Sequence, residues 1–209
     1  MVFTKPYLNT AFADLANEEQ IERAVEALEK NGIRVFRAQN ADEAREKLLE
    51  LIPEGAEVFT STSRTLESID VLSDIDERYN SVRAQLAKMN PKTENRAMQK
   101  LGATPQYMVG SVHAVTEDGK VVVASNTGSQ LAGYAASAEH VIWVVGAQKI
   151  VKDLDEAMQR IEEYAYPLEN ERAQQAYGIN SHISKLLIVN KEANPNRTSM
   201  IIVDENLGF

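Results

Sequence analysis

The sequence predicts an α/β protein with a mixed, largely parallel sheet flanked by helices. Capping-box patterns at Asn17 with Gln20 and at Asn40 with Glu43 open two amphipathic helices, and a short apolar strand follows each helix. Helix–strand repeats at this spacing favour right-handed crossovers between parallel strands. The third observation is His140–Val145, an almost wholly apolar run that is typical of a strand covered on both faces.

The first half of the chain alternates apolar helical patterns with short strands. Gly32 and Pro53 end the first two helices, and a third helix is expected through the apolar residues from 66 to 72. The strands expected between these helices are Ile33–Phe36 and Glu57–Thr60. Residues 73–106 are harder to assign, and we interpret them as a substrate-facing flap or a subunit contact with helical turns near Arg83–Ala87 and Glu94–Leu101.

The second half opens with a hairpin. Two β-branched segments flank Asp118-Gly119, which is a strong hairpin turn signal, and the chain then turns helical through Leu131–Ala138. Two more helices follow the buried strand. The apolar segments Leu186–Val189 and Met200–Val203 come last, and the Asn-Pro-Asn turn between them indicates that they could pair as a C-terminal hairpin.

Length and composition limit the classes of protein to which the chain can belong. The chain has 209 residues, which suits one α/β domain over residues 1–209, with residues 1–16 as an arm packed on the body or on the second subunit of a homodimer. The net charge of −9 argues against nucleic-acid binding, which depends on Lys and Arg. Without a signal-peptide core or an apolar run of about 18–20 residues, we expect a cytoplasmic protein that does not enter membranes.

The cysteine and histidine content excludes several kinds of catalytic and metal site. The chain has no cysteine, so it has no disulfide, cysteine nucleophile, thiolate zinc site or cysteine-ligated iron–sulfur cluster of its own. Its three histidines show no paired spacing. We therefore predict no metal site and no cofactor in this chain.

One candidate site is the turn between the hairpin and the next helix, formed by Ser125, Asn126, Thr127, Gly128, Ser129 and Gln130. The first N–H groups of a helix have no internal partner, and the helix dipole favours negative charge there. Glycine lets a ligand come close, and the hydroxyls can donate to a phosphate or carboxylate. The alternative is an ordinary turn in which a hydroxyl caps the helix.

A second strand-to-helix turn carries the candidate ligand contacts Thr60, Ser61, Ser63 and Arg64. In a parallel sheet such turns lie at the carboxyl ends of the strands, where ligands usually bind, so both turns could line one crevice. The guanidinium of Arg64 could hold a carboxylate or phosphate in bidentate fashion. The alternative is a helix cap beside a surface arginine. The loop lacks the glycines of a P-loop, so we do not expect nucleoside triphosphates.

Two further residues are candidate catalytic groups. His113 lies in the first hairpin strand and could act as a general base near neutral pH, or it could be a half-buried strand histidine with a satisfied hydrogen bond. Lys149 follows the buried strand and could neutralise an anionic substrate, or it could be a surface lysine.

Three segments together resemble the LUD-domain family in its lactate-utilization protein C type: GSVHAVTEDGKVVVASNTGSQ, HVIWVVGAQKIVKDLDEA and IIVDENLGF. The resemblance runs from about Glu57 to Phe209 and, more loosely, through the N-terminal helices. It implies the fold shared by sugar-phosphate isomerases and coenzyme A transferases. It also implies a relation to iron–sulfur lactate oxidation systems, in a family where most members lack an assigned activity.

The resemblance and the two turns lead to one main hypothesis and two alternatives. In the main hypothesis the chain binds a small anionic metabolite and acts with iron–sulfur oxidoreductase partners in oxidising L-lactate to pyruvate. Any cluster would belong to a partner, because this chain has no cysteine. The alternatives are a stand-alone isomerase or transferase acting on a phosphosugar or acyl-CoA, and a non-enzymatic regulatory or scaffold subunit. The sequence leaves open whether the chain catalyses a reaction alone.

Overall fold

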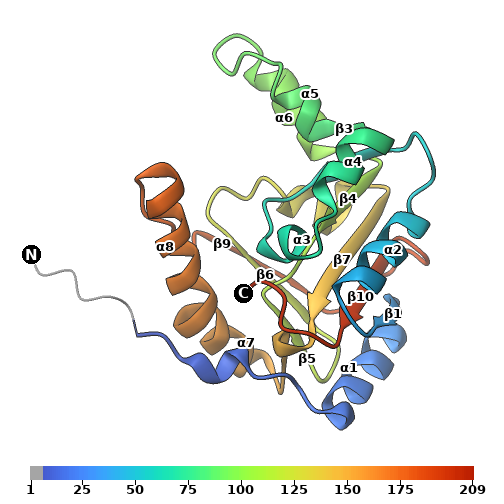
Figure 1. Ribbon diagram of the computed structural model, residues 1–209, viewed down its shortest axis with the longest axis vertical. Coiled ribbons are helices and arrows are strands. Elements are labelled where there is room, and N and C mark those ends of the chain that lie inside the picture. The colour runs from blue at the N-terminus through green and yellow to red at the C-terminus, as the bar shows by residue number, and fades with distance from the viewer. Residues whose placement is uncertain (1–6) are drawn as a thin grey trace, which may run out of the picture.

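A six-stranded parallel sheet forms the centre of the computed structural model, which describes residues 7–209 (Figure 1). Its strands, in spatial order, are β1 (Arg34–Ala38), β10 (Thr198–Val203), β7 (His140–Gly146), β4 (Tyr107–Gly110), β2 (Glu57–Thr60) and β3 (Asn80–Ser81). Every neighbouring pair in this sheet is parallel. The carboxyl ends of its strands therefore meet along one edge.

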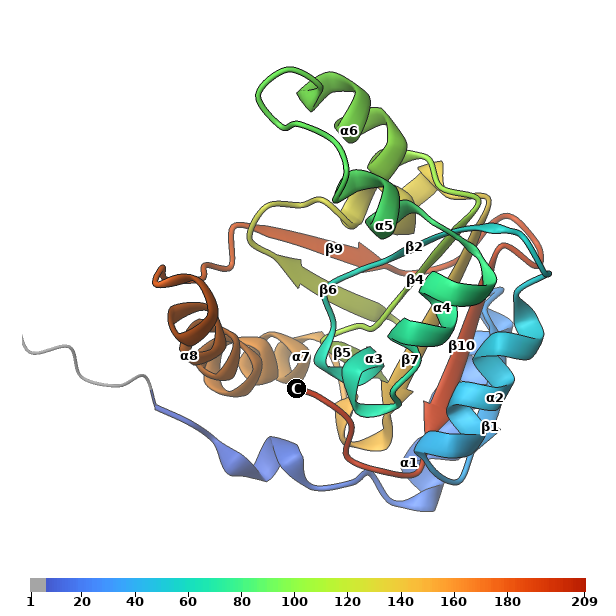
Figure 2. The same ribbon diagram turned by 45° about the horizontal axis from the view of Figure 1, so that its top comes forward.

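A second, four-stranded sheet contains the antiparallel pairs. Its strands, in spatial order, are β8 (Ile150–Val151), β5 (Ala114–Thr116), β6 (Val121–Ser125) and β9 (Lys185–Val189). In Figure 2, β6 and β9 run across the direction of β7 and β10. The predicted α/β class with a largely parallel sheet is confirmed, and the predicted hairpin is present as β5 and β6, in a sheet of its own.

The predicted C-terminal hairpin is wrong. β9 pairs with β6, whereas β10 lies between β1 and β7 in the parallel sheet. All six residues of β10 are buried, which suits a central strand covered on both faces. β9 leaves Leu186 and Ile188 exposed, which suits an edge strand of the other sheet.

Helices cover both sheets. The α-helices are α1 (Glu18–Lys30), α2 (Ala41–Leu51), α3 (Arg64–Ser68), α4 (Leu72–Arg78), α5 (Val82–Leu86), α6 (Asn95–Ala103), α7 (Leu154–Arg160) and α8 (Tyr166–Tyr177). The 3-10 helices are η1 (Thr10–Ala13) and η3 (Ala147–Lys149), and the π-helices are η2 (Gly133–Ser137) and η4 (Ile161–Ala165). Within residues 7–209, no helix combines the length and apolar character needed to span a membrane.

Local signals explain where several helices begin and end. Both helices begin at the predicted caps. In α1 the capping box is complete, and the Asn17 side chain accepts from the Gln20 N–H at 3.0 Å. In α2 the Asn40 side chain accepts from the Glu43 N–H at 3.0 Å, while the Glu43 carboxylate accepts from the Gln39 N–H and not from the N-cap residue. The helix expected through residues 66–72 is instead split into α3 and α4, because Asp70 has a positive φ of 50° between them. The helix expected over Leu131–Ala138 is mostly the π-helix η2.

The core follows the alternation of side chains along the parallel strands. Along β7, Val141, Trp143 and Val145 pack with α1 and the second sheet, while Ile142 and Val144 pack with α2 and α3 on the opposite face. The far face of the second sheet packs on α7 and η4. The second sheet is therefore a middle layer, buried between the parallel sheet and α7.

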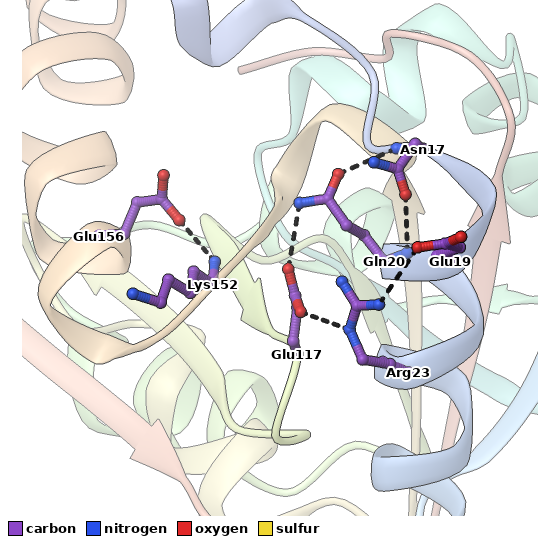
Figure 3. A network of polar contacts seen from close by, with 7 residues as sticks. All are labelled: Asn17, Glu19, Gln20, Arg23, Glu117, Lys152 and Glu156. Atoms are coloured by element: carbon purple, nitrogen blue, oxygen red, sulfur yellow. Dashed lines mark hydrogen bonds and ion pairs between the residues drawn. The ribbon is translucent and has the colours of Figure 1, made fainter.

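A polar network fixes the hairpin of the second sheet to α1 (Figure 3). The Glu117 carboxylate, at the turn, accepts from Arg23 Nε at 2.7 Å and from Gln20 Nε2 at 3.1 Å. The Asn31 side chain donates to the backbone oxygens of Asp118 and Gly119, just past the end of the same helix. These bonds hold the hairpin, and with it the start of the Ser125–Gln130 turn, in one orientation.

The predicted arm, residues 1–16, packs on the body over its described part. The Asn9 N–H donates to the Glu163 carbonyl at 2.9 Å, and the Ala16 N–H donates to the Ala147 carbonyl at 3.4 Å. Residues 1–6 lie outside the described residues. Between residues 73 and 106, α5 and α6 project from the body in both views (Figures 1 and 2).

Arg197 joins β10 to the helix that follows the Ser125–Gln130 turn. Its guanidinium donates to the carbonyls of Gly133, Tyr134 and Ala138, at 2.7, 3.1 and 3.1 Å. It also forms an ion pair with Glu192 at 2.8 Å, and both side chains are almost fully buried. One arginine therefore binds carbonyls at the start of η2 and just past its end, and compensates a buried carboxylate.

We predict that Arg197→Met lowers the free energy of unfolding by about 3–5 kcal/mol, because it leaves Glu192 buried without a counter-ion and removes the donor from the three carbonyls. Urea unfolding measures this loss. The control is Arg37→Met, which removes an arginine paired on the surface with Glu18 and Asp204, and should change the stability by no more than about 1 kcal/mol. Equal losses in the two variants would contradict the role given to Arg197.

Candidate functional site

A cavity of about 640 Å³ lies at the carboxyl edge of the parallel sheet. Segments that follow β2, β4 and β7 line it, together with α5, α8 and the closing residue Phe209. This edge is where open parallel sheets usually bind ligands. The volume lies within the range of about 300–1,000 Å³ that is usual for small-molecule sites.

The cavity brings together most of the residues predicted from the sequence. The predicted residues that line it are Ser61, Ser63, Arg64, His113, Ser125, Asn126, Thr127, Ser129, Gln130 and Lys149. The two predicted residues that do not line it are Thr60 and Gly128. The two polar turns therefore share one cavity, although the Ser125–Gln130 turn follows a strand of the second sheet and not a parallel strand.

Thr60 lies behind the cavity wall and holds Arg83, a lining residue that the sequence analysis did not select. Arg83 Nε donates to Thr60 Oγ1 at 3.1 Å, and a terminal nitrogen of Arg83 donates to the Thr60 carbonyl at 2.6 Å. The end of β2 therefore positions a guanidinium from α5 at the cavity.

The Ser125–Gln130 turn is held by its own side chains. The Gly128 N–H donates to Ser125 Oγ at 2.8 Å, and Ser125 Oγ donates to Gln130 Oε1 at 3.1 Å. Gly128 has φ of 85°, and a Cβ there would lie 2.7 Å from the Lys185 side chain, so glycine is required for the turn. Because Ser125 uses the Gly128 N–H, this turn offers a ligand mainly its hydroxyl and amide side chains.

Arg64 and Ser63 lie at the start of α3, where they also serve the helix. The Ser63 hydroxyl caps α3 by accepting from the Leu66 N–H at 3.3 Å. The Arg64 guanidinium is paired with Glu67 in the next turn, and its side chain is 51% exposed. The Arg64 guanidinium therefore lies at the solvent-exposed opening of the cavity and not at its buried end.

Lys149 is buried, with 1% of its surface exposed, so it is not the surface lysine considered from the sequence. Its Nζ donates to Thr65 Oγ1 at 2.8 Å and to Ser111 Oγ at 3.1 Å. Burial, and after it the nearby Arg160 guanidinium, lower the pKa of Lys149 well below its usual value. Its polar neighbours are hydroxyls and carry no negative charge.

Arg160 lies next to Lys149 and is completely buried. It donates to the carbonyls of Gln148 and His113 at 3.3 and 2.5 Å, and one of its terminal nitrogens has no hydrogen-bond partner among the described residues. Burial lowers the pKa of Arg160 to about 10, so it stays charged at neutral pH. None of the ion pairs formed within residues 7–209 includes Lys149 or Arg160.

His113 is half-buried in the cavity wall and is held in one tautomer. Its Nδ1 accepts from the Ala124 N–H at 3.1 Å, so the ring proton lies on Nε2. Burial lowers the pKa of His113 to about 3, with further contributions from Lys149 and Arg160. At neutral pH His113 is therefore a neutral donor through Nε2, and its Nδ1 is not free to act as a base.

The Tyr134 hydroxyl and Gly110 shape the part of the cavity wall near Ser61. Tyr134 Oη donates to Ser61 Oγ at 3.1 Å, and burial raises the pKa of Tyr134 to about 12, which keeps the hydroxyl protonated. A Cβ at Gly110 would collide with both hydroxyl oxygens. Because Gly110, the last residue of β4, has no side chain, Tyr134 can reach Ser61.

The closing segment of the chain is hydrogen-bonded to two neighbours of Lys149, Thr65 and Gln148. Thr65 Oγ1, which accepts from Lys149, donates in turn to the Leu207 carbonyl at 3.0 Å. Gln148 Nε2 donates to the same carbonyl at 3.1 Å. These bonds tie the segment to the surroundings of Lys149, and its last residue, Phe209, lines the cavity.

The fold and this cavity define an α/β protein with a polar pocket at the carboxyl edge of its sheet. The family model for the LUD domain matches residues 21–206, and the chain belongs to that family. A crystal structure of a DUF162 family protein from Deinococcus radiodurans is similar, with a TM-score of 0.59 and 11% sequence identity over 91% of this chain and 99% of that chain. At this identity the likeness shows the fold alone. No curated protein sequence matches the chain.

Membership of the LUD domain family supports a role related to lactate utilization in general terms.

We predict that acid destabilises the protein partly through His113. The folded chain keeps His113 neutral down to a pKa of about 3, whereas the unfolded chain binds a proton below about 6.5, so stability falls as the pH falls between these values. His113→Asn keeps an acceptor for the Ala124 N–H and should flatten this part of a stability-against-pH curve, by an amount on the order of a few kcal/mol.

Chemical denaturation between pH 3 and pH 7 checks this expectation. The matched control is His182→Asn, which changes an exposed histidine and should keep the acid slope of the unchanged protein. A slope that is the same with and without the His113 ring would show that His113 is not held neutral by its surroundings.

Proposed function

We propose that the cavity binds a small anionic metabolite with a carboxylate group, and that the protein uses this site in lactate utilization. One observation carries the proposal: Lys149 and Arg160 are buried beside the cavity without a carboxylate partner among the described residues. A bound carboxylate would supply the missing negative charge.

The empty and the occupied site differ in electrostatic free energy. Burying a basic group without a counter-ion is unfavourable, and the low dielectric of the interior strengthens any attraction to an anion that enters. The anion would also favour the protonated form of Lys149 and so raise its pKa. Arg83 adds a guanidinium at the cavity wall, and it too forms no ion pair within residues 7–209.

The neutral groups in the wall would orient the ligand. Ser61 and Ser111 line the same cavity with their hydroxyls, and the His113 Nε2–H is a further donor. Hydrogen bonds from several donors to a charged acceptor are stronger than those between neutral groups. This donor set suits the carboxylate and the 2-hydroxyl or 2-oxo group of L-lactate or pyruvate.

The redox step is assigned to partners. Converting L-lactate to pyruvate removes two electrons and two protons, and this chain has no cysteine that could hold an iron–sulfur cluster. We therefore place the electron acceptor in iron–sulfur oxidoreductase subunits that act with this chain. Co-purification with a cysteine-rich partner tests this part of the proposal.

A thermal stability measurement tests the binding site. L-lactate or pyruvate at about a hundredfold over the dissociation constant should stabilise the protein by about 2.7 kcal/mol, which is roughly 5–10 °C in melting temperature for a chain of this length. Lys149→Met and Arg83→Met should each reduce the shift, because each removes a basic group from the cavity.

The control for this measurement is Lys152→Met, which changes a lysine that is 79% exposed and should keep the full shift. Inorganic phosphate, phosphosugars and coenzyme A esters complete the panel of anions. Melting temperatures that do not respond to any carboxylate, or shifts that survive in both cavity variants, would refute the proposal.

The size of the cavity favours a second candidate. A volume of about 640 Å³ is much larger than a three-carbon acid, and Tyr166, Tyr177 and Phe209 add aromatic surface to its wall. A stand-alone isomerase or transferase acting on a phosphosugar or acyl-CoA would use that space. Turnover of such a substrate by the purified chain, lost in Lys149→Met, would favour this candidate over the first.

A further inference from the structure

We propose that Lys149 is a nucleophile that forms an imine with the carbonyl carbon of a 2-oxo acid bound in the cavity. This inference rests on the proposed function, because it requires that the cavity bind a carboxylate. It goes further by assigning a covalent step to this chain and by selecting 2-oxo acids over other anions.

The surroundings of Lys149 differ from those of a structural lysine. Lys47 forms an ion pair with Glu50, and Lys120 forms one with Asp118. Both lysines lie at the surface and are partly exposed. Lys149 is more deeply buried, yet its Nζ contacts only hydroxyl oxygens, and it lines the cavity. A carboxylate partner would hold the lysine as an ammonium ion, whereas hydroxyls can bind either the ammonium or the neutral amine.

Arg160 supplies the second condition for a nucleophilic lysine. Lysines become nucleophilic when they are removed from water or placed next to another cationic group, because both conditions favour the neutral amine. Both apply to Lys149, whose pKa is lowered by its own burial and by the Arg160 guanidinium. Arg160 donates to two backbone carbonyls and is completely buried, so its charge stays beside the amine.

The remaining groups of the cavity suit a carboxylate that adjoins the carbonyl. Arg83, which Thr60 holds in place, keeps a positive charge in the cavity wall when Lys149 is neutral. The Ser61 hydroxyl, which accepts from Tyr134 and keeps its own proton, and the His113 Nε2–H are neutral donors for the carboxylate and for the oxygen that develops on the carbonyl. A 2-oxo acid presents both groups within a few bonds.

The reaction balances without an oxidant or a reductant. The lone pair of the Lys149 Nζ attacks the carbonyl carbon, the C–N bond forms, and the carbonyl oxygen takes up a proton. The resulting carbinolamine loses that oxygen as water when the nitrogen releases its proton and the C=N bond forms. Ser111 Oγ, which accepts from Nζ at 3.1 Å, is placed to relay the proton.

Reductive trapping tests the inference on the full chain. The protein is incubated with pyruvate and sodium cyanoborohydride, which reduces an imine to a stable secondary amine, and the product is analysed by intact and peptide mass spectrometry. We expect one added carboxyethyl group per chain, located on the peptide that contains Lys149. L-lactate, which has no carbonyl, should give no adduct and should compete with pyruvate.

Two variants sharpen the test. Lys149→Met should lose the adduct, while Lys152→Arg, which changes an exposed lysine three residues further on, should keep it. If Lys149→Met does not fold, the position of the adduct in the unchanged protein decides the question. A longer 2-oxo acid, 4-methyl-2-oxopentanoate, tests whether the spare volume of the cavity admits a side chain.

The outcomes separate this inference from the proposed function. Pyruvate that raises the melting temperature without an adduct on Lys149 would overturn the imine and leave the anion site standing. Adducts spread evenly over exposed lysines would also overturn the imine. The absence of both a thermal shift and an adduct, for both 2-oxo acids, would overturn the inference and the proposed anion site together.

Discussion

Lys149 in the cavity wall and the neighbouring Arg160 are both buried, and no carboxylate among the described residues compensates them. Such an arrangement is unfavourable in an empty protein, because burial penalises each charge and the two basic groups repel each other. The surrounding structure offsets this with neutral donors and acceptors: Thr65 and Ser111 bind the amine, and two carbonyls bind the guanidinium. The site is therefore complementary to a negative charge that the chain itself does not provide.

Distant parts of the fold maintain this site. The parallel sheet brings the ends of β2, β4 and β7 to one edge, so that Ser61, Ser111 and Lys149 meet although they are far apart in the sequence. The second sheet, held to α1 by the Glu117 network, adds His113 and the Ser125–Gln130 turn. Function at this edge depends on both sheets keeping their relative positions, and the bonds from Glu117 to α1 add to the apolar packing that holds the second sheet in place.

The sequence revealed the α/β class and both polar turns because these depend on local signals, namely capping boxes, strand ends and runs of hydroxyl residues. It did not reveal the position of β10 in the parallel sheet. The sequence of a short apolar strand is compatible with an edge position and with a central position, and only its neighbours distinguish the two. Arg160 was missed for a related reason. It lies within the apolar stripe formed by Ala157 and Ile161, and an arginine in such a stripe is a signal that can be recognised beforehand. The Lys149 side chain is linked to Leu207 through Thr65, and no local pattern encodes a contact between positions 65 and 207.

The most direct measurement is the pKa of Lys149 in the intact protein, obtained by NMR from the titration of lysine side chains labelled with ¹³C. Comparison with Lys149→Met assigns the signal. The account predicts a pKa well below the ordinary value of about 10.4 in the free protein, and a rise when L-lactate saturates the cavity. An ordinary pKa that does not change when L-lactate is added would contradict the claim that Lys149 is a buried basic group whose counter-ion is the bound anion.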